Sequence, residues 1–124
     1  MLREIGTYLQ SQGIGTLEAN LFLGLMPDQP DNCIALFEYA GSPPDLHWPG
    51  EYPGLQVRVR NKSYAAARTK IGEAMTALHG LHEQTLSGTR YLLIKARGSP
   101  EVLKRDNNNR VELFVNFEII KERD

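Results

Sequence analysis

The strongest structural signal in the sequence is Val111-Glu112-Leu113-Phe114-Val115-Asn116-Phe117-Glu118-Ile119-Ile120. Every odd-numbered residue of this stretch is apolar, whereas most even-numbered residues are polar or charged. Successive side chains of a strand point to opposite faces of the sheet, so the alternation predicts a strand with one buried face. A sheet with a hydrophobic core on one side is therefore expected.

Four further segments have the composition of strands, namely residues 21–26, 33–39, 55–60 and 90–97. Segment 33–39 differs from the others because it is apolar at nearly every position. A strand that is apolar at both parities is covered on both faces. We expect the helices on one side of this strand, and either a folded-over loop or another subunit on the other.

Two helices are predicted. The first carries Leu2, Ile5, Tyr8 and Leu9 at helical spacing and ends near Gly13. The second begins after Ser63, whose side chain can cap the first turn, and ends near Gly80. Its predicted apolar stripe is Tyr64, Ala67, Ile71, Met75 and Leu78. Together the segments predict a single α+β domain over residues 1–124, with an antiparallel or mixed sheet of four to five strands packed against two helices.

Composition narrows the possible functions. The 124 residues suit one domain, and a formal net charge of −1 lacks the basic excess of most nucleic-acid-binding proteins. The single cysteine, Cys33, cannot form an internal disulfide. The N-terminus lacks the pattern of a signal peptide, and no apolar run approaches the ~20 residues that cross a bilayer. We expect a soluble protein made in a cytoplasm, with no membrane partner.

The segment from Gly41 to Gly54 is unusual because seven of its fourteen residues are glycine or proline. We expect it to form a long loop with neither regular helix nor inner strand. The loop carries Trp48, the only tryptophan, and Tyr52. Two interpretations stand equally: these aromatic side chains anchor an interface with a partner, or the loop packs Trp48 back over its own core.

No catalytic, cofactor-binding or metal-binding site is predicted. His79 and His82 lie beside Glu83, but a catalytic zinc site needs three protein ligands, and Gly80 should unwind the chain between the two imidazoles. Cys33 lies in an apolar run, where burial makes a thiol inert. Neither a GxSxG elbow nor a complete dinucleotide-binding fingerprint is present.

Four basic residues fall on the outward parity of two predicted strands: Arg58, Arg60, Lys95 and Arg97. If these strands are neighbours, the side chains form a basic stripe. The simpler interpretation is a solvated sheet face that Glu112 and Glu118 neutralise across the strands. The functional interpretations are a subunit interface or a pore wall, followed by nucleic-acid binding, since only Tyr91 supplies an aromatic ring at that parity.

Several segments, in this order along the chain, resemble the bacteriophage minor capsid protein family. They are Met1-Leu2-Arg3-Glu4-Ile5, Leu21-Phe22-Leu23-Gly24-Leu25-Met26-Pro27, Glu38-Tyr39-Ala40-Gly41-Ser42-Pro43-Pro44, Pro53-Gly54-Leu55-Gln56-Val57-Arg58-Val59-Arg60, Tyr64-Ala65-Ala66-Ala67-Arg68, Gly88-Thr89-Arg90-Tyr91 and Val115-Asn116-Phe117-Glu118. The family occurs among head–tail joining genes of long-tailed phages and in prophages. The resemblance implies a virion protein similar to tail terminator or tail-completion proteins, which have no catalytic residues.

The resemblance further implies a ring, typically a hexamer, that caps the finished tail tube at the head–tail junction, stops its growth and presents a surface for the head. Its partners would be copies of itself, the tail tube protein and a head-completion or connector protein, with DNA passing through the lumen. The alternative is a head-side connector or stopper that contacts channel DNA. A small enzyme of unrecognised type ranks last.

Overall fold

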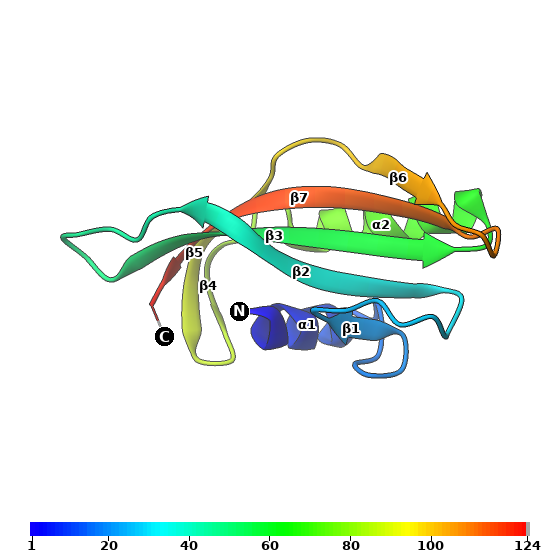
Figure 1. Ribbon diagram of the computed structural model, residues 1–124. Helices are drawn as coiled ribbons and strands as arrows, with labels where there is room; N and C mark the ends of the chain where they lie inside the picture. The colour runs from blue at the N-terminus through cyan, green and yellow to red at the C-terminus, as the bar shows by residue number, and fades with distance from the viewer. Residues whose placement is uncertain (124) are drawn as a thin grey trace.

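The computed structural model describes residues 1–123, which form two helices and seven strands (Figure 1). In chain order they are α1 (Leu2–Ser11), β1 (Leu21–Leu23), β2 (Cys33–Ser42), β3 (Gly50–Asn61), α2 (Tyr64–Leu78), β4 (His82–Leu86), β5 (Thr89–Ala96), β6 (Glu101–Arg105) and β7 (Val111–Glu122). The α+β class and the two helices are as the sequence predicts. Neither helix is long and apolar enough to span a membrane, within the residues described.

All seven strands belong to one mixed sheet with the order β1-β2-β3-β7-β5-β4, and β6 pairs with β7 beside this path. Only β1 and β2 run parallel; the other neighbours are antiparallel. The sheet curves like half of a barrel, and both helices lie on its inner side (Figure 1). The expected four to five strands were too few, because β4 and β6 carry almost no hydrophobic pattern.

β7 is the central strand and behaves as the alternation predicts. Its odd-numbered residues from Val111 to Ile119 are buried against the helices, with at most 2% of each exposed. One edge of β7 pairs with β3 along nearly its whole length. The other edge pairs with β5 near the C-terminal end of β7 and with β6 near Val111. β5 and β6 therefore lie one after the other along the same edge of β7.

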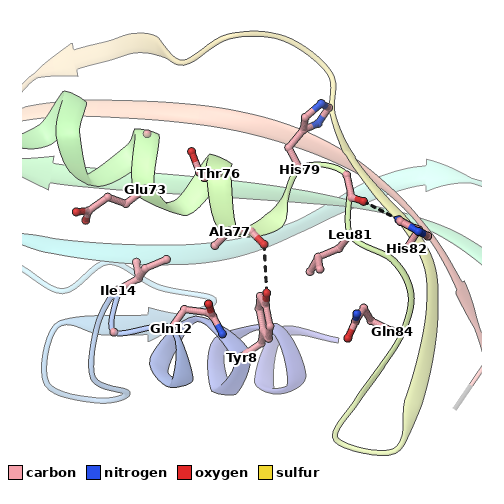
Figure 2. A pocket seen from close by; sticks show the side chains of 13 residues that line it. Tyr8, Gln12, Ile14, Glu73, Thr76, Ala77, His79, Leu81, His82 and Gln84 are labelled. Atoms are coloured by element: carbon pink, nitrogen blue, oxygen red, sulfur yellow. Dashed lines mark hydrogen bonds between the residues drawn. The ribbon is translucent and has the colours of Figure 1, made fainter.

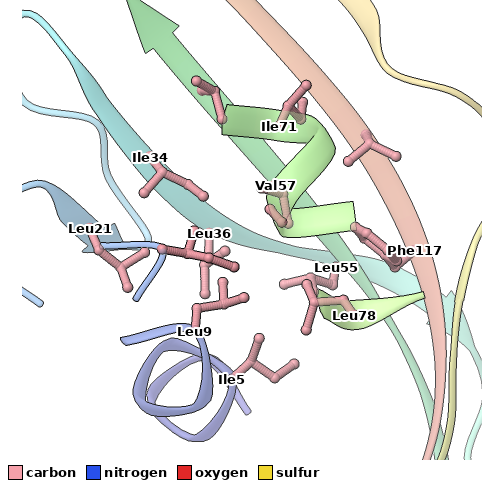
Figure 3. Packing of buried hydrophobic residues seen from close by; sticks show 14 of the residues in the cluster. Ile5, Leu9, Leu21, Ile34, Leu36, Leu55, Val57, Ile71, Leu78 and Phe117 are labelled. Carbon is pink, nitrogen blue, oxygen red and sulfur yellow. The ribbon is translucent and has the colours of Figure 1, made fainter. Parts of the chain in front are cut away.

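The core lies between the sheet and the two helices (Figure 3). Ile5 and Leu9 of α1 point toward Leu36, Leu55 and Leu78, and all five side chains are fully buried. Burying one such side chain contributes roughly 1.5–3 kcal/mol. Ser63 caps α2 by accepting a hydrogen bond from Ala66 N at 3.2 Å, as expected.

One residue of the predicted α2 stripe is wrong. Ala67, Ile71 and Leu78 are buried, but Tyr64 is 48% exposed. Tyr64 begins the helix, beyond the part of α2 that packs on the sheet.

Tyr91 also faces the other way from its predicted parity. It is fully buried on the inner face, where its hydroxyl donates to Glu4 Oε1 at 2.6 Å. The β5–β7 register shifts between Tyr91 and Leu93. A bulge adds one residue to a strand and reverses the facing of the side chains beyond it, so Tyr91 and Ile94 share the core side.

The glycine- and proline-rich segment is mostly strand, which corrects the expectation of a long loop. β2 continues to Ser42 and β3 begins at Gly50, so only residues 43–49 form the connection. Pro53 lies within β3, but it has no Cα partner in the register of either neighbouring strand. A proline without an N–H is tolerated at such a gap in the ladders. The β2–β3 hairpin extends past the rest of the sheet (Figure 1).

Candidate functional site

The four basic residues of the expected stripe lie apart. β7 separates β3 from β5, with Arg58 opposite Phe114 and Lys95 opposite Glu118. Four residues of strand span about 13 Å, so these two side chains are staggered along the sheet as well as separated across it. The assumption that the two strands are neighbours was wrong, and the face of the sheet away from the helices, the outer face, carries no continuous basic stripe.

Arg60 is a buried structural residue, only 4% exposed. Its guanidinium donates to four carbonyl oxygens of the chain before β2: Pro27 at 2.6 Å, Pro30 at 2.7 Å, Asp31 at 3.1 Å and Asp28 at 3.3 Å. The segment 27–31 therefore folds over the outer face at the end of β3. The side of β2 away from the helices was expected to be covered by either a folded-over loop or another subunit. At the start of β2 the structure shows the folded-over loop.

Arg110 holds the same loop from the other side and is 3% exposed. It donates to Asp28 O at 2.5 Å and contacts the carboxylates of Asp28, Asp106 and Asp31 at 2.8, 2.8 and 3.3 Å. The hydrogen bonds to Asp28 and Asp106, together with the charges of these two carboxylates, raise the pKa of the guanidinium, although desolvation opposes them. Arg60 and Arg110 thus fix the loop to the sheet.

Arg58 is half-buried and stacks on Phe37, with its guanidinium carbon 4.5 Å from the ring centroid. Its Nε donates to Gln56 Oε1 at 2.6 Å. Lys95 and Arg97 are exposed. The Tyr39 hydroxyl beside Arg97 raises the pKa of that guanidinium, and the charge of Glu118 adds to the effect.

The hairpin tip, residues 43–49, is organised by Asp45. Its carboxylate accepts hydrogen bonds from His47 N at 2.9 Å and from the Tyr52 hydroxyl at 3.2 Å. The hydrogen bond from His47 is the main cause that lowers the pKa of Asp45. Arg123 N donates to Pro49 O at 2.7 Å, which ties the tip to the end of β7. The tip is therefore an ordered structure.

Trp48 is half-buried and packs on its own hairpin. A Cβ at residue 50 would overlap the indole ring, so glycine is needed at that position. The tip therefore folds back on itself, but Trp48 packs on the hairpin and is not part of the hydrophobic core that one of the two interpretations expects. Leu46, by contrast, is a large apolar side chain of the tip that is 92% exposed.

A recess of about 450 Å³ lies at the base of the hairpin on the outer face. Tyr39, Tyr52, Arg97 and Glu118 line it, so two of the expected interface residues meet here. The Tyr39 ring lies over Gly54, where a Cβ would overlap it, and its hydroxyl donates to Phe117 O at 3.0 Å. The recess combines apolar walls with one cation and one carboxylate.

A groove of about 760 Å³ lies between α1 and the C-terminal part of α2 (Figure 2). Tyr8 spans it by donating to Ala77 O at 3.4 Å. His79 and His82 belong to its rim and point in different directions (Figure 2). The left-handed Gly80, with φ +87°, separates them as expected. The Nδ1 atom of His79 accepts a hydrogen bond from Ala96 N at 2.9 Å.

Few groups suited to catalysis come together. Within residues 1–123, no three His, Cys, Asp or Glu side chains form a metal-binding cluster. Cys33 is buried, as its apolar run predicts, and burial raises the pKa of its thiol.

Sequence patterns missed several residues that shape these surfaces. No periodic pattern in the sequence points to the role of Arg110, because its partners Asp28 and Asp31 lie 82 and 79 residues away in the chain. Leu46 lies two residues from Trp48, and no sequence pattern singles it out. Val102 and Leu103, which are 52% and 40% exposed, belong to the unpredicted strand β6.

Comparison with known proteins assigns the family. Residues 8–123 match the family described as bacteriophage tail terminator protein. The chain belongs to this family. The match covers nearly the whole sequence and confirms the expected relation to tail terminators.

The fold of this family member also occurs in a solved particle. A chain in the structure titled "Virion of native gene transfer agent (GTA) particle" is similar over 98% of this chain and 88% of that chain, with a TM-score of 0.67 and 16% sequence identity. At this identity the similarity concerns the fold. No curated protein sequence matches significantly. Family membership makes the chain a structural protein of a phage tail.

Proposed function

We propose that copies of this chain close into a ring, with six as the expected number, on the end of a finished tail tube. The ring stops polymerisation of the tube and presents a surface for the head at the head–tail junction. The family match over residues 8–123 carries this proposal. The proposed partners are further copies of the chain, the tail tube protein and a head-completion protein, with DNA passing through the lumen.

The structure supports a function that depends on contacts with other chains. Two exposed features are suited to such contacts: a projecting hairpin tip with an exposed leucine, and an edge strand, β6, whose residues are all exposed. Copies that associate head-to-tail form a closed ring only where the rotation between neighbours fits. Each contact can then be weak, so that isolated chains remain monomeric and assemble on the tube as a template.

Sedimentation with and without tail tubes tests the proposal. The chain should sediment alone as a small species and should move to the pellet with preformed tubes. When it is added during polymerisation of the tube protein, the tubes should become shorter. A protein of similar mass without relation to phage tails is the control. Persistent absence from the pellet, together with unchanged tube length, would contradict the proposal.

The alternative is a head-side connector that contacts channel DNA. Two of the four basic residues that could contact DNA are instead engaged within the chain. Arg60 is buried against the loop and Arg58 stacks on Phe37. Of these four basic residues, only Lys95 and Arg97 are exposed. DNA contact would make binding steeply dependent on salt. Salt-dependent DNA binding that disappears in the Lys95→Ala/Arg97→Ala variant would favour this alternative over the tail terminator.

A further inference from the structure

β6 is an open edge of the sheet. It pairs only with β7, and all five of its residues are exposed. Two of them, Val102 and Leu103, are large apolar residues that are 52% and 40% exposed. An edge strand with free backbone groups and exposed apolar side chains is suited to contact with another chain.

The hairpin tip has matching properties. Leu46 at its end is 92% exposed, although Asp45 and Arg123 hold the surrounding backbone in place. An apolar side chain on an ordered loop needs little additional ordering when it binds. Beyond Leu36, β2 pairs only with β3, so the strand leading to the tip also has an open edge.

The charges of the two surfaces are complementary. Between residues 38 and 52 the chain has carboxylates but neither lysine nor arginine. Glu51 pairs with Lys121, whereas Glu38 is exposed and has no ion pair among the described residues. β6 carries Glu101 at one end and Lys104 and Arg105 at the other. Lys104 pairs with Glu112 at 3.8 Å, whereas Arg105 hydrogen-bonds to Asn109 and has no carboxylate partner among residues 1–123.

The two surfaces cannot meet within one molecule. The hairpin tip and β6 lie toward opposite ends of the long sheet (Figure 1). A contact between complementary surfaces at opposite ends of a molecule is heterologous and joins one copy to the next. The occupant that fits β6 on apolar character and charge is therefore a second copy of this chain.

The geometry points to a head-to-tail contact in which the hairpin tip of one copy packs along β6 of the next. Leu46 packs on Val102 and Leu103, and Glu38 faces the basic end of β6 at Arg105. The contact deepens the proposed function by naming the surfaces that join the copies of the ring.

Disulfide trapping between two variants tests this contact. Leu46→Cys and Leu103→Cys are prepared separately with tags of different mass, then mixed and oxidised. All the replaced side chains are exposed, so the fold should be retained. The mixture should give a covalent dimer of the two tagged chains that neither variant forms alone. A disulfide forms only where the two Cα atoms approach within about 7 Å, so Val102→Cys serves as a second acceptor.

Two controls accompany the mixture. The wild-type chain should stay monomeric after oxidation, because Cys33 is buried. Thr7→Cys, on the exposed side of α1, should not cross-link to Leu46→Cys. Trapping is performed in concentrated free protein and on capped tail tubes. Absence of the mixed dimer with both acceptors in both samples, or dimers that join only tip to tip, would overturn the inference. Tubes that are still capped in that case would leave the proposed function standing.

Discussion

Arg58 and Arg60 lie on the same face of β3, two residues apart, and both are predicted surface cations. The structure gives them different surroundings: Arg60 is enclosed by four carbonyl oxygens, whereas Arg58 is half-buried over Phe37. The alternation of the strand predicts the shared face correctly. It cannot predict the loop from residues 27–31 that covers one of them, because that contact is distant in sequence.

Replacing Arg60 should destabilise the chain much more than replacing Arg58. Hydrogen bonds to a charged group contribute about 1.5–3 kcal/mol, so Arg60→Met should lower the free energy of unfolding by about 2–3 kcal/mol. Arg58→Met removes an accessible cation–π contact that contributes about 0.5–1 kcal/mol. Urea unfolding of both variants measures the difference, and equal losses would contradict the role given to Arg60.

The aspartates around the loop should make stability sensitive to acid. Hydrogen bonding to Lys62 is the largest effect on Asp31 and lowers its pKa below 3.8. Burial alone would raise the pKa of Asp106, but hydrogen bonds from Arg110 and Asn108 outweigh it and lower that pKa below 3.8. A carboxyl group whose pKa is depressed in the folded state stabilises the fold above its unfolded pKa. This stabilisation is lost as the pH falls through the folded pKa.

Unfolding of wild type and Asp106→Asn between pH 7 and pH 2 checks this expectation. The variant should be less stable than wild type at pH 7, because its amide lacks the charge that pairs with Arg110. The difference should begin to shrink at about pH 4, where the carboxyl group becomes protonated in the unfolded chain, and should disappear as the pH falls through the lower pKa of the folded chain. A difference that stays constant over the whole range would show that Asp106 acts without its charge.

At the scale of elements, the sequence predicts the inner strands and α2 well, because each buries one regular face. β7 and α2 are found where periodicity and capping place them. β4 and β6 were missed because they are edge strands: only Leu86 is buried in β4, and no residue is buried in β6. Without a buried face, a strand has no alternating pattern to recognise.

The glycine and proline residues of the hairpin misled the prediction in a different way. They indicate irregular backbone, yet Gly54 and Gly50 make room for the rings of Tyr39 and Trp48. These glycines serve close packing across the hairpin. Sequence alone could name Trp48 and Tyr52 as candidate residues, but it could not show that both contact their own hairpin.

Gly50→Ala should displace the indole ring of Trp48. The added methyl group would overlap the ring, so Trp48 must become more exposed, and its fluorescence emission should shift to longer wavelength. Trp48 is the only tryptophan, so the signal reports on this site alone. Gly98→Ala is the matched control, because a Cβ there meets nothing within 4 Å. Unchanged emission in Gly50→Ala would contradict the packing described.

At the scale of the whole molecule, the sheet joins two different ends. One end carries the projecting hairpin and the other carries β6 and the loop held by Arg60 and Arg110 (Figure 1). A subunit with unlike ends is suited to head-to-tail association, which composition and periodicity cannot reveal. The proposed ring rests on the family, and the proposed contact between its copies rests on the placement of these two ends.

Imaging of tail tubes assembled with this chain would show whether the chain caps them. We expect tubes formed in its presence to carry, at one end only, a closed ring of copies of the chain, joined through the hairpin tip and β6. Tubes that keep growing past the bound chain, or chains distributed along the tube wall with no ring at the end, would contradict this expectation.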